Sequence, residues 1–107
     1  MSILFYDHLV DKHEVIIFIE KLDEPENYKS RMKHLVDDII HQGLIKFILD
    51  KLHPTHHVTF LTRVKSAPYD PEIIYYLKDH VSPDIEEELS READKLISII
   101  MKDLEES

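Results

Sequence analysis

Residues 26–52 read ENYKSRMKHLVDDIIHQGLIKFILDKL and lie within the longest proline-free run of the chain. Apolar side chains recur there at helical spacing, which predicts one long helix over about 26–52. The apolar positions fall on two nearly opposite sides of that helix: Met32, Leu35, Val36, Ile39 and Gly43, then Ile45, Ile48, Leu49 and Leu52. The apolar face therefore changes sides near Gly43, where we expect a change of packing partner. A glycine inside a helix costs about 1 kcal/mol relative to alanine, so we also expect a close helix crossing or a mild kink there.

The segment before this helix has two possible local structures. Asp11 and Glu14 form a D-x-x-E cap, in which Asp11 accepts from the amide of residue 14, and a helix over about 12–22 should follow. The run VIIFI within it is β-branched, so a buried strand is the alternative. Residues 2–10 are apolar and short; we expect a helical turn or two, with a strand as the alternative.

Prolines and capping residues mark the other helices. Pro25 suits the first turn of the long helix, with Asp23 or Glu24 at its cap. Asp70-Pro71-Glu72 and Ser82-Pro83-Asp84 are strong helix starts. The later helices are expected over about 55–65, 71–79 and 83–104. The side chains predicted to be largely buried are Leu35, Ile39, Phe47, Leu89, Leu96 and Ile100.

The composition is typical of a small, acidic, all-α protein. The chain has 107 residues with one Gly, five Pro and no Cys, which leaves little material for hairpins, Gly-rich phosphate loops or Cys-type zinc sites. Its 13 Lys and Arg against 22 Asp and Glu give a net charge of −9, which opposes nucleic-acid binding. No apolar run is long enough to span a membrane, and we expect a cytoplasmic location. We predict one domain, residues 1–107, forming a small bundle of about five helices around one long central helix.

One side of the long helix carries side chains that metals prefer. His34, Asp37, Asp38 and His41 are spaced three, four and seven residues apart, which places them within an arc of about 100°. Imidazole and carboxylate together suit zinc, manganese or non-haem iron. The arc lies opposite the first apolar set, so a solvated face explains it more simply. No Glu-x-x-His motif of di-metal bundles is present, and we expect no cofactor.

Other clusters have both a functional and a structural interpretation. HPTHH, residues 53–57, can bind a metal, but a solvated turn with its rings pointing in different directions is simpler. Residues 86–88 are all Glu; they can face a basic partner, or they can favour the positive end of a helix dipole. Tyr69, Tyr75 and Tyr76 suit either an interface or the edge of the core. No serine lies in a G-x-S-x-G turn, and we expect no enzyme.

Apolar residues outside the main stripes indicate an interaction surface. A chain of 107 residues cannot easily bury all of them. Residues 2–10 are also too short to form an independent helix in water, so they must dock on something. One choice is the groove between residues 12–22 and the long helix of the same chain. We favour the other, the same groove of a second copy. The candidate interaction residues are Ile3, Leu4, Phe5, Ile16 and Ile17.

From about Phe18 to Leu104 the chain resembles a family of short all-helical proteins of unknown function that is common in uncultured candidate-phylum bacteria. The matching features are FIEKLDEPENYKSRMKHLVDDII, then LIKFILDKL with a helix break, a short helix, DPEIIYYLKDHVSPDI and a terminal amphipathic helix. The resemblance implies a helical core over 14–104 and assigns no reaction and no site residue. The apolar extension, residues 1–13, and the eight histidines depart from the family pattern.

We therefore expect a non-enzymatic module for protein–protein interaction or self-association, with a homodimer as one form and neither nucleic acid nor membrane as a partner. The alternative is a metal-binding helical protein that uses the His/Asp face of the long helix. A third hypothesis is an inhibitor that mimics the charge of nucleic acid with its acidic last helix.

Overall fold

The computed structural model describes residues 4–106, and within that range every regular element is a helix. The prediction of an all-α bundle around one long helix is confirmed. In chain order the elements are the 3₁₀ turn η1 (Asp7–Leu9), α1 (His13–Glu20), α2 (Glu26–Lys51), the 3₁₀ turn η2 (Pro54–His56), α3 (His57–Ser66), α4 (Glu72–His80) and α5 (Ile85–Glu106).

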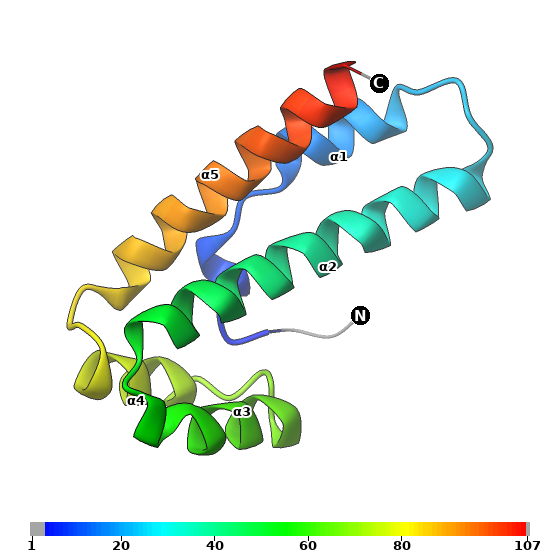
Figure 1. Ribbon diagram of the computed structural model, residues 1–107. Coiled ribbons are helices and arrows are strands. Elements are labelled where there is room, and N and C mark those ends of the chain that lie inside the picture. Colours follow the sequence, from blue (N-terminus) through cyan, green and yellow to red (C-terminus); the bar gives the residue numbers. More distant parts are fainter. Residues whose placement is uncertain (1–3, 107) are drawn as a thin grey trace.

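Helices α2 and α5 run antiparallel, and their contact forms the length of the molecule (Figure 1). Helix α1 packs against both of them, while α3 and α4 lie together beyond the C-terminal end of α2. The N-terminal turn η1 packs against α5. The result is elongated, 47 × 24 × 20 Å, and its buried side chains form one apolar cluster.

The VIIFI segment is helical, as predicted, and the strand alternative is wrong. Val15 and Ile19 are completely buried because they are four residues apart and share one face of α1, whereas Ile17 is 37% exposed. The expected cap differs in detail: the Asp11 carboxylate accepts from the amide of His13, 3.0 Å away, instead of residue 14. Pro25 itself precedes α2, without a side-chain cap from Asp23 or Glu24.

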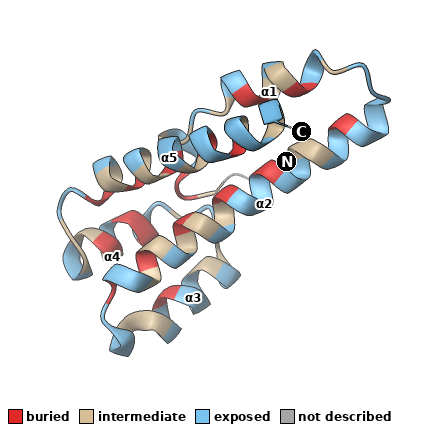
Figure 2. Ribbon diagram, turned by 45° about the horizontal axis from the view of Figure 1, so that its top comes forward, coloured by how far each residue is buried: buried red, intermediate tan, exposed pale blue. Residues whose placement is uncertain are grey.

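The apolar face of α2 lies in a different phase from the predicted one. Leu35 and Ile39 were expected in the core, but they are 59% and 41% exposed. The buried row is Lys29, Val36, Ile40, Leu44 and Ile48. Figure 2 shows buried positions along the length of α2. Steps of four residues turn the row by about 40° each, so the predicted change of side takes place gradually from Val36 to Ile48 and not abruptly at Gly43. Of the other predicted core residues, Leu89 and Ile100 are buried, whereas Phe47 and Leu96 are only partly buried.

Gly43 marks the close helix crossing that its position predicted. A Cβ atom built on it would lie 2.6 Å from Cδ1 and 2.9 Å from Cδ2 of Leu96 on α5. The side chain of Leu96 therefore occupies the space that a residue larger than glycine would need. This contact explains why α2 tolerates its single glycine.

A buried lysine fixes the turn between α1 and α2. Lys29 is only 9% exposed, and its Nζ donates to the carbonyl oxygen of Glu20, the last residue of α1, at 2.8 Å. A cation at this position also faces the negative end of the α1 dipole. Lys33 pairs with the Glu20 carboxylate, so two residues of α2 hold the end of α1.

Replacing Gly43 with Ala should affect stability differently in two backgrounds. In the wild type the gain of about 1 kcal/mol in helix propensity is offset because Leu96 has to move. In a Leu96→Ala background the space is open, so Gly43→Ala should raise the free energy of unfolding by about 0.5–1 kcal/mol. Urea unfolding of the four proteins measures this coupling, and equal effects in both backgrounds would contradict the crossing.

Candidate functional site

The N-terminal segment, residues 4–12, docks on its own chain in this structure. Phe5 and Tyr6 are 3% and 2% exposed. The amide of Phe5 donates to the carbonyl of Pro68 at 2.7 Å, and its ring meets Phe60 edge-on with 6.3 Å between centroids. Within this chain Phe5 is therefore buried against α3 and the α3–α4 loop, and its role as an interaction residue between copies stays a prediction.

The other proposed interaction residues have different surroundings. Leu4 and Ile16 are partly buried and pack against the core, while Ile17 remains exposed. Ile3 lies outside the described residues. Of the four described candidates only Ile17 is exposed, by 37%, so these residues form no large exposed apolar surface.

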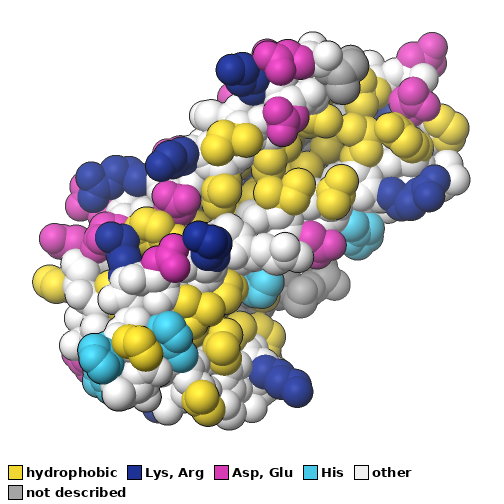
Figure 3. All heavy atoms as spheres, viewed as in Figure 1, with side chains coloured by type: hydrophobic (Ala, Val, Ile, Leu, Met, Phe, Trp, Pro, Cys, Tyr) yellow, Lys and Arg dark blue, Asp and Glu magenta, His cyan; other side chains and the backbone are white. Residues whose placement is uncertain are grey.

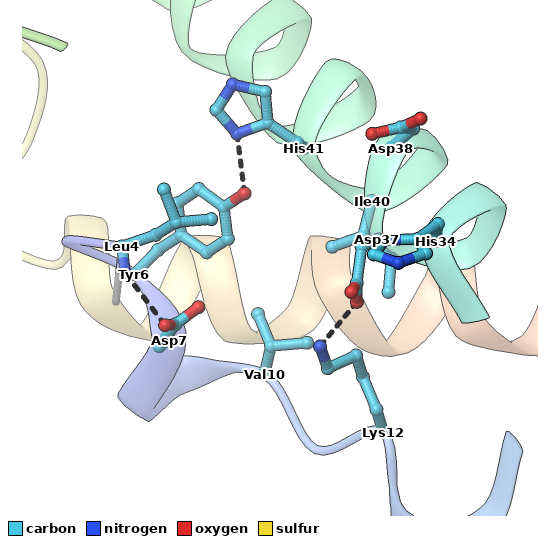
Figure 4. A pocket seen from close by; sticks show the side chains of 10 residues that line it. All are labelled: Leu4, Tyr6, Asp7, Val10, Lys12, His34, Asp37, Asp38, Ile40 and His41. Atoms are coloured by element: carbon cyan, nitrogen blue, oxygen red, sulfur yellow. Dashed lines mark hydrogen bonds and ion pairs between the residues drawn. The ribbon is translucent and has the colours of Figure 1, made fainter. Parts of the chain in front are cut away.

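A polar groove separates the N-terminal segment from α2 (Figure 4). Its volume is about 520 Å³. The Tyr6 hydroxyl and His41 Nδ1 form a hydrogen bond of 2.6 Å across one end. The Lys12 ammonium donates to the Asp37 carboxylate at 2.5 Å across the other. These two contacts tie the segment to α2 at both ends of the groove.

All four metal candidates line this groove, but they do not converge. His41 is turned toward Tyr6, Asp37 is paired with Lys12, and Asp38 points away from both (Figure 4). The Lys12 ammonium supplies the positive charge beside Asp37 that a metal would otherwise supply. Within residues 4–106, no three His, Asp or Glu side chains form an arrangement able to hold a metal ion.

The tyrosine in this groove is held in its neutral form. Burial raises the pKa of the Tyr6 hydroxyl well above its usual value, and the charges of Asp7 and Asp37 raise it further. The hydroxyl therefore stays protonated at every physiological pH and serves as a hydrogen-bonding group, not as a base. This arrangement positions a chain segment and supplies no nucleophile.

The histidines of the HPTHH segment point in different directions, as predicted. His53 Nδ1 accepts from the amide of Thr55, and His57 Nε2 contacts the carbonyl of Leu52 at 2.8 Å. The His56 ring stacks near His80 of α4, with centroids 4.2 Å apart, and beside Tyr76. Each ring therefore contributes to the α2–α3–α4 junction.

The acidic start of α5 also has a structural role. Glu86 contacts Lys78 of α4 at 2.9 Å and His8 of the N-terminal segment at 3.0 Å. The hydrogen bond from Lys78, followed by that from His8, lowers the pKa of Glu86. The Glu86 carboxylate thus joins α5 to α4 and to the N-terminal segment. Its position in a run of three glutamates does not predict this role.

The largest departure from the predicted core lies on the opposite side of α2 from the polar groove. The α2–α5 groove, of about 230 Å³, is lined by Met32, Leu35, Val36, Ile39, Ile100, Asp103 and Leu104. Tyr28, 43% exposed, lies one turn before Met32, and Ile99, 53% exposed, lies one turn before Asp103. Figure 3 shows hydrophobic side chains gathered along this line between the two helices.

Comparisons with known proteins do not extend this description: no family model, no curated protein and no solved structure matches the chain. The resemblance to the bacterial helical family stays a prediction. None of the helices within residues 4–106 is both long and apolar enough to cross a membrane.

Tyr6→Phe should destabilise the protein modestly. The variant keeps the buried ring and loses the hydrogen bond to His41, so the free energy of unfolding should fall by about 0.5–1.5 kcal/mol. Tyr75→Phe, at a tyrosine that is 58% exposed, is the matched control and should be neutral. Equal effects at the two tyrosines would contradict the docking role of Tyr6.

Glu86→Gln should flatten the loss of stability in acid. Because the folded pKa of Glu86 lies below its ordinary value of 4.5, its contribution is present above that pH and is lost as the pH falls through the folded pKa. The variant should be less stable than wild type near neutral pH, and the difference should vanish between about pH 5 and pH 3. Urea unfolding across this range measures it. Glu87→Gln, at an exposed carboxylate without an ion pair in the described chain, is the control.

Proposed function

We propose that this protein is a non-enzymatic interaction module and that the α2–α5 groove is its binding surface. The observation that carries the proposal is the exposure of Leu35 and Ile39 beside Ile100 in one apolar groove. Large apolar side chains that line a continuous groove on a surface are typical of a binding site, whereas isolated ones are ordinary.

The spacing of the exposed residues supports this assignment. Tyr28, Met32, Leu35 and Ile39 follow a 4-3-4 pattern and so form a straight stripe along α2. The stripe repeats the heptad pattern with which helices pack on one another. Its apolar character was evident in the sequence as a face of α2, but within the described chain α5 covers only part of it.

The neighbouring features favour binding over catalysis. In the polar groove the hydroxyl of Tyr6 is bonded to His41, and Lys12 is paired with Asp37, so these groups are engaged in structural contacts. Metal binding, the alternative suggested by the sequence, lacks a converging ligand set in the described residues. The apolar groove therefore remains the better-supported site.

Leu35→Lys should abolish partner binding without unfolding the protein. Leu35 is 59% exposed, so the substitution should change the free energy of unfolding by less than about 0.5 kcal/mol. A charge in the centre of the groove should nevertheless prevent apolar contact. Chemical cross-linking in cells that express the chain, followed by mass spectrometry, compares the partners of both forms.

Val58→Lys is the matched control, because Val58 is 76% exposed on α3, away from the groove. Wild type and Val58→Lys should retain the same cross-linked partners, and Leu35→Lys should lose them. Cross-links that are identical in all three proteins, or absent from wild type, would contradict the proposal.

A further inference from the structure

We propose that the occupant of the α2–α5 groove is a cationic amphipathic helix of a partner protein. This inference rests on the proposed function and specifies the partner. It depends on three observations: the shape of the groove, the charges at its rim and the net charge of the whole chain.

The shape of the groove favours a helix. Its two walls are antiparallel helices, and together with α1 they form three helices of a bundle (Figure 1). The exposed stripe from Tyr28 to Ile39 covers about three turns of α2, a length that matches one face of a short helix. An apolar face with residues at i, i+3, i+4 and i+7 would lie along the stripe and complete a four-helix bundle.

Among the described residues that line the groove, the one charged side chain is an acid, Asp103. Glu105 and Glu106 follow it in the last turn of α5, which contains no basic residue. Acids at a helix C-terminus add to the negative end of the dipole, so this arrangement is unfavourable without an external cation. The α1–α2 loop contributes Asp23 and Glu24 just before the stripe begins.

Nearby lysines do not neutralise these five acids. Lys29 and Lys33 are both engaged with Glu20. The remaining cations of this region are Lys21, Arg31 and Lys102, and no ion pair within residues 4–106 joins any of them to the five acids. A partner helix with Lys and Arg beside its apolar face would therefore gain from contacts with the acids on the α5 side of the groove.

The net charge disfavours a second copy as the occupant. Each chain carries −9, so a homodimer built on this groove would bring two acidic surfaces together. At physiological salt charges interact over about 8 Å, so acids that a dimer brought together across the groove would repel one another. A cationic partner removes this repulsion and gains attraction in its place.

The test uses two synthetic 18-residue helical peptides with Leu at i, i+3, i+4 and i+7. One has Lys at the remaining positions and the other has Glu. A Leu/Lys peptide of the same composition in scrambled order controls for charge alone. Fluorescence anisotropy at physiological salt should give binding of the Leu/Lys helix at least tenfold tighter than that of either other peptide.

Protein variants separate the apolar contribution from the charged one. Leu35→Lys should weaken the Leu/Lys helix by about tenfold or more, and Val58→Lys should leave it unchanged. The triple variant Asp103→Asn, Glu105→Gln, Glu106→Gln should weaken it by about tenfold, since each exposed pair contributes modestly. A second triple variant alters the charge equally at the far end of the bundle and should leave binding of the Leu/Lys helix unchanged. Its substitutions are Glu72→Gln, Asp79→Asn and Glu87→Gln.

The other outcomes contradict this inference in distinguishable ways. Equal binding of the Leu/Lys and Leu/Glu helices would reject the cationic partner and leave the apolar surface intact. Tight binding of the scrambled peptide would reject the helix. A doubling of mass in light scattering at high micromolar concentration, lost in Leu35→Lys, would identify a second copy as the occupant. No binding of any peptide, with Leu35-dependent cross-links in cells, would reject this partner class but retain the proposed function.

Discussion

The contact between Leu96 and Gly43 determines how α5 lies on α2. At this one position α2 has no side chain, so Leu96 approaches the backbone and brings the two helices together. One row of α5 is buried as a result of this close contact. It consists of Ile85, Leu89, Ala93, Ile97 and Ile100. Toward the N-terminal end of α2 the corresponding face has large side chains, those of Met32, Leu35 and Ile39. There the α2–α5 groove lies open between the helices.

The two sides of α2 consequently have different properties. On one side, the N-terminal segment closes over the helix with a buried aromatic ring, a hydroxyl–imidazole hydrogen bond and an ion pair to Lys12. On the other, apolar side chains meet solvent. Exposed ion pairs contribute little to stability, whereas the buried rings of Phe5 and Phe60 contribute more, so docking of the segment depends mainly on the aromatic contact. A long central helix can thus serve both as core and as surface.

Local signals were sufficient to predict the helices but not their exposure. Proline and capping residues gave their approximate bounds, and Asp70 accepts from the amide of Glu72 as its position predicted. Periodicity identified Leu35 and Ile39 as apolar positions, yet no pattern within α2 states whether a neighbour covers them. The docking of Phe5 and the joining of three elements by Glu86 depend on contacts distant in sequence, so neither could be predicted locally. The four His and Asp residues do share one groove, but Lys12, from another element, decides what Asp37 binds.

The N-terminal segment has a consequence for the order in which the chain can fold during synthesis. Its contacts are with His41, Phe60, Pro68 and Glu86, so the ribosome makes the segment first and its last contact residue some eighty residues later. Contacts between distant residues form late, because closing a long loop costs entropy before any contact is gained. Phe5 and Tyr6 therefore cannot be buried against these partners on the nascent chain until α3 and the α3–α4 loop have emerged, so an aromatic pair stays exposed during much of translation.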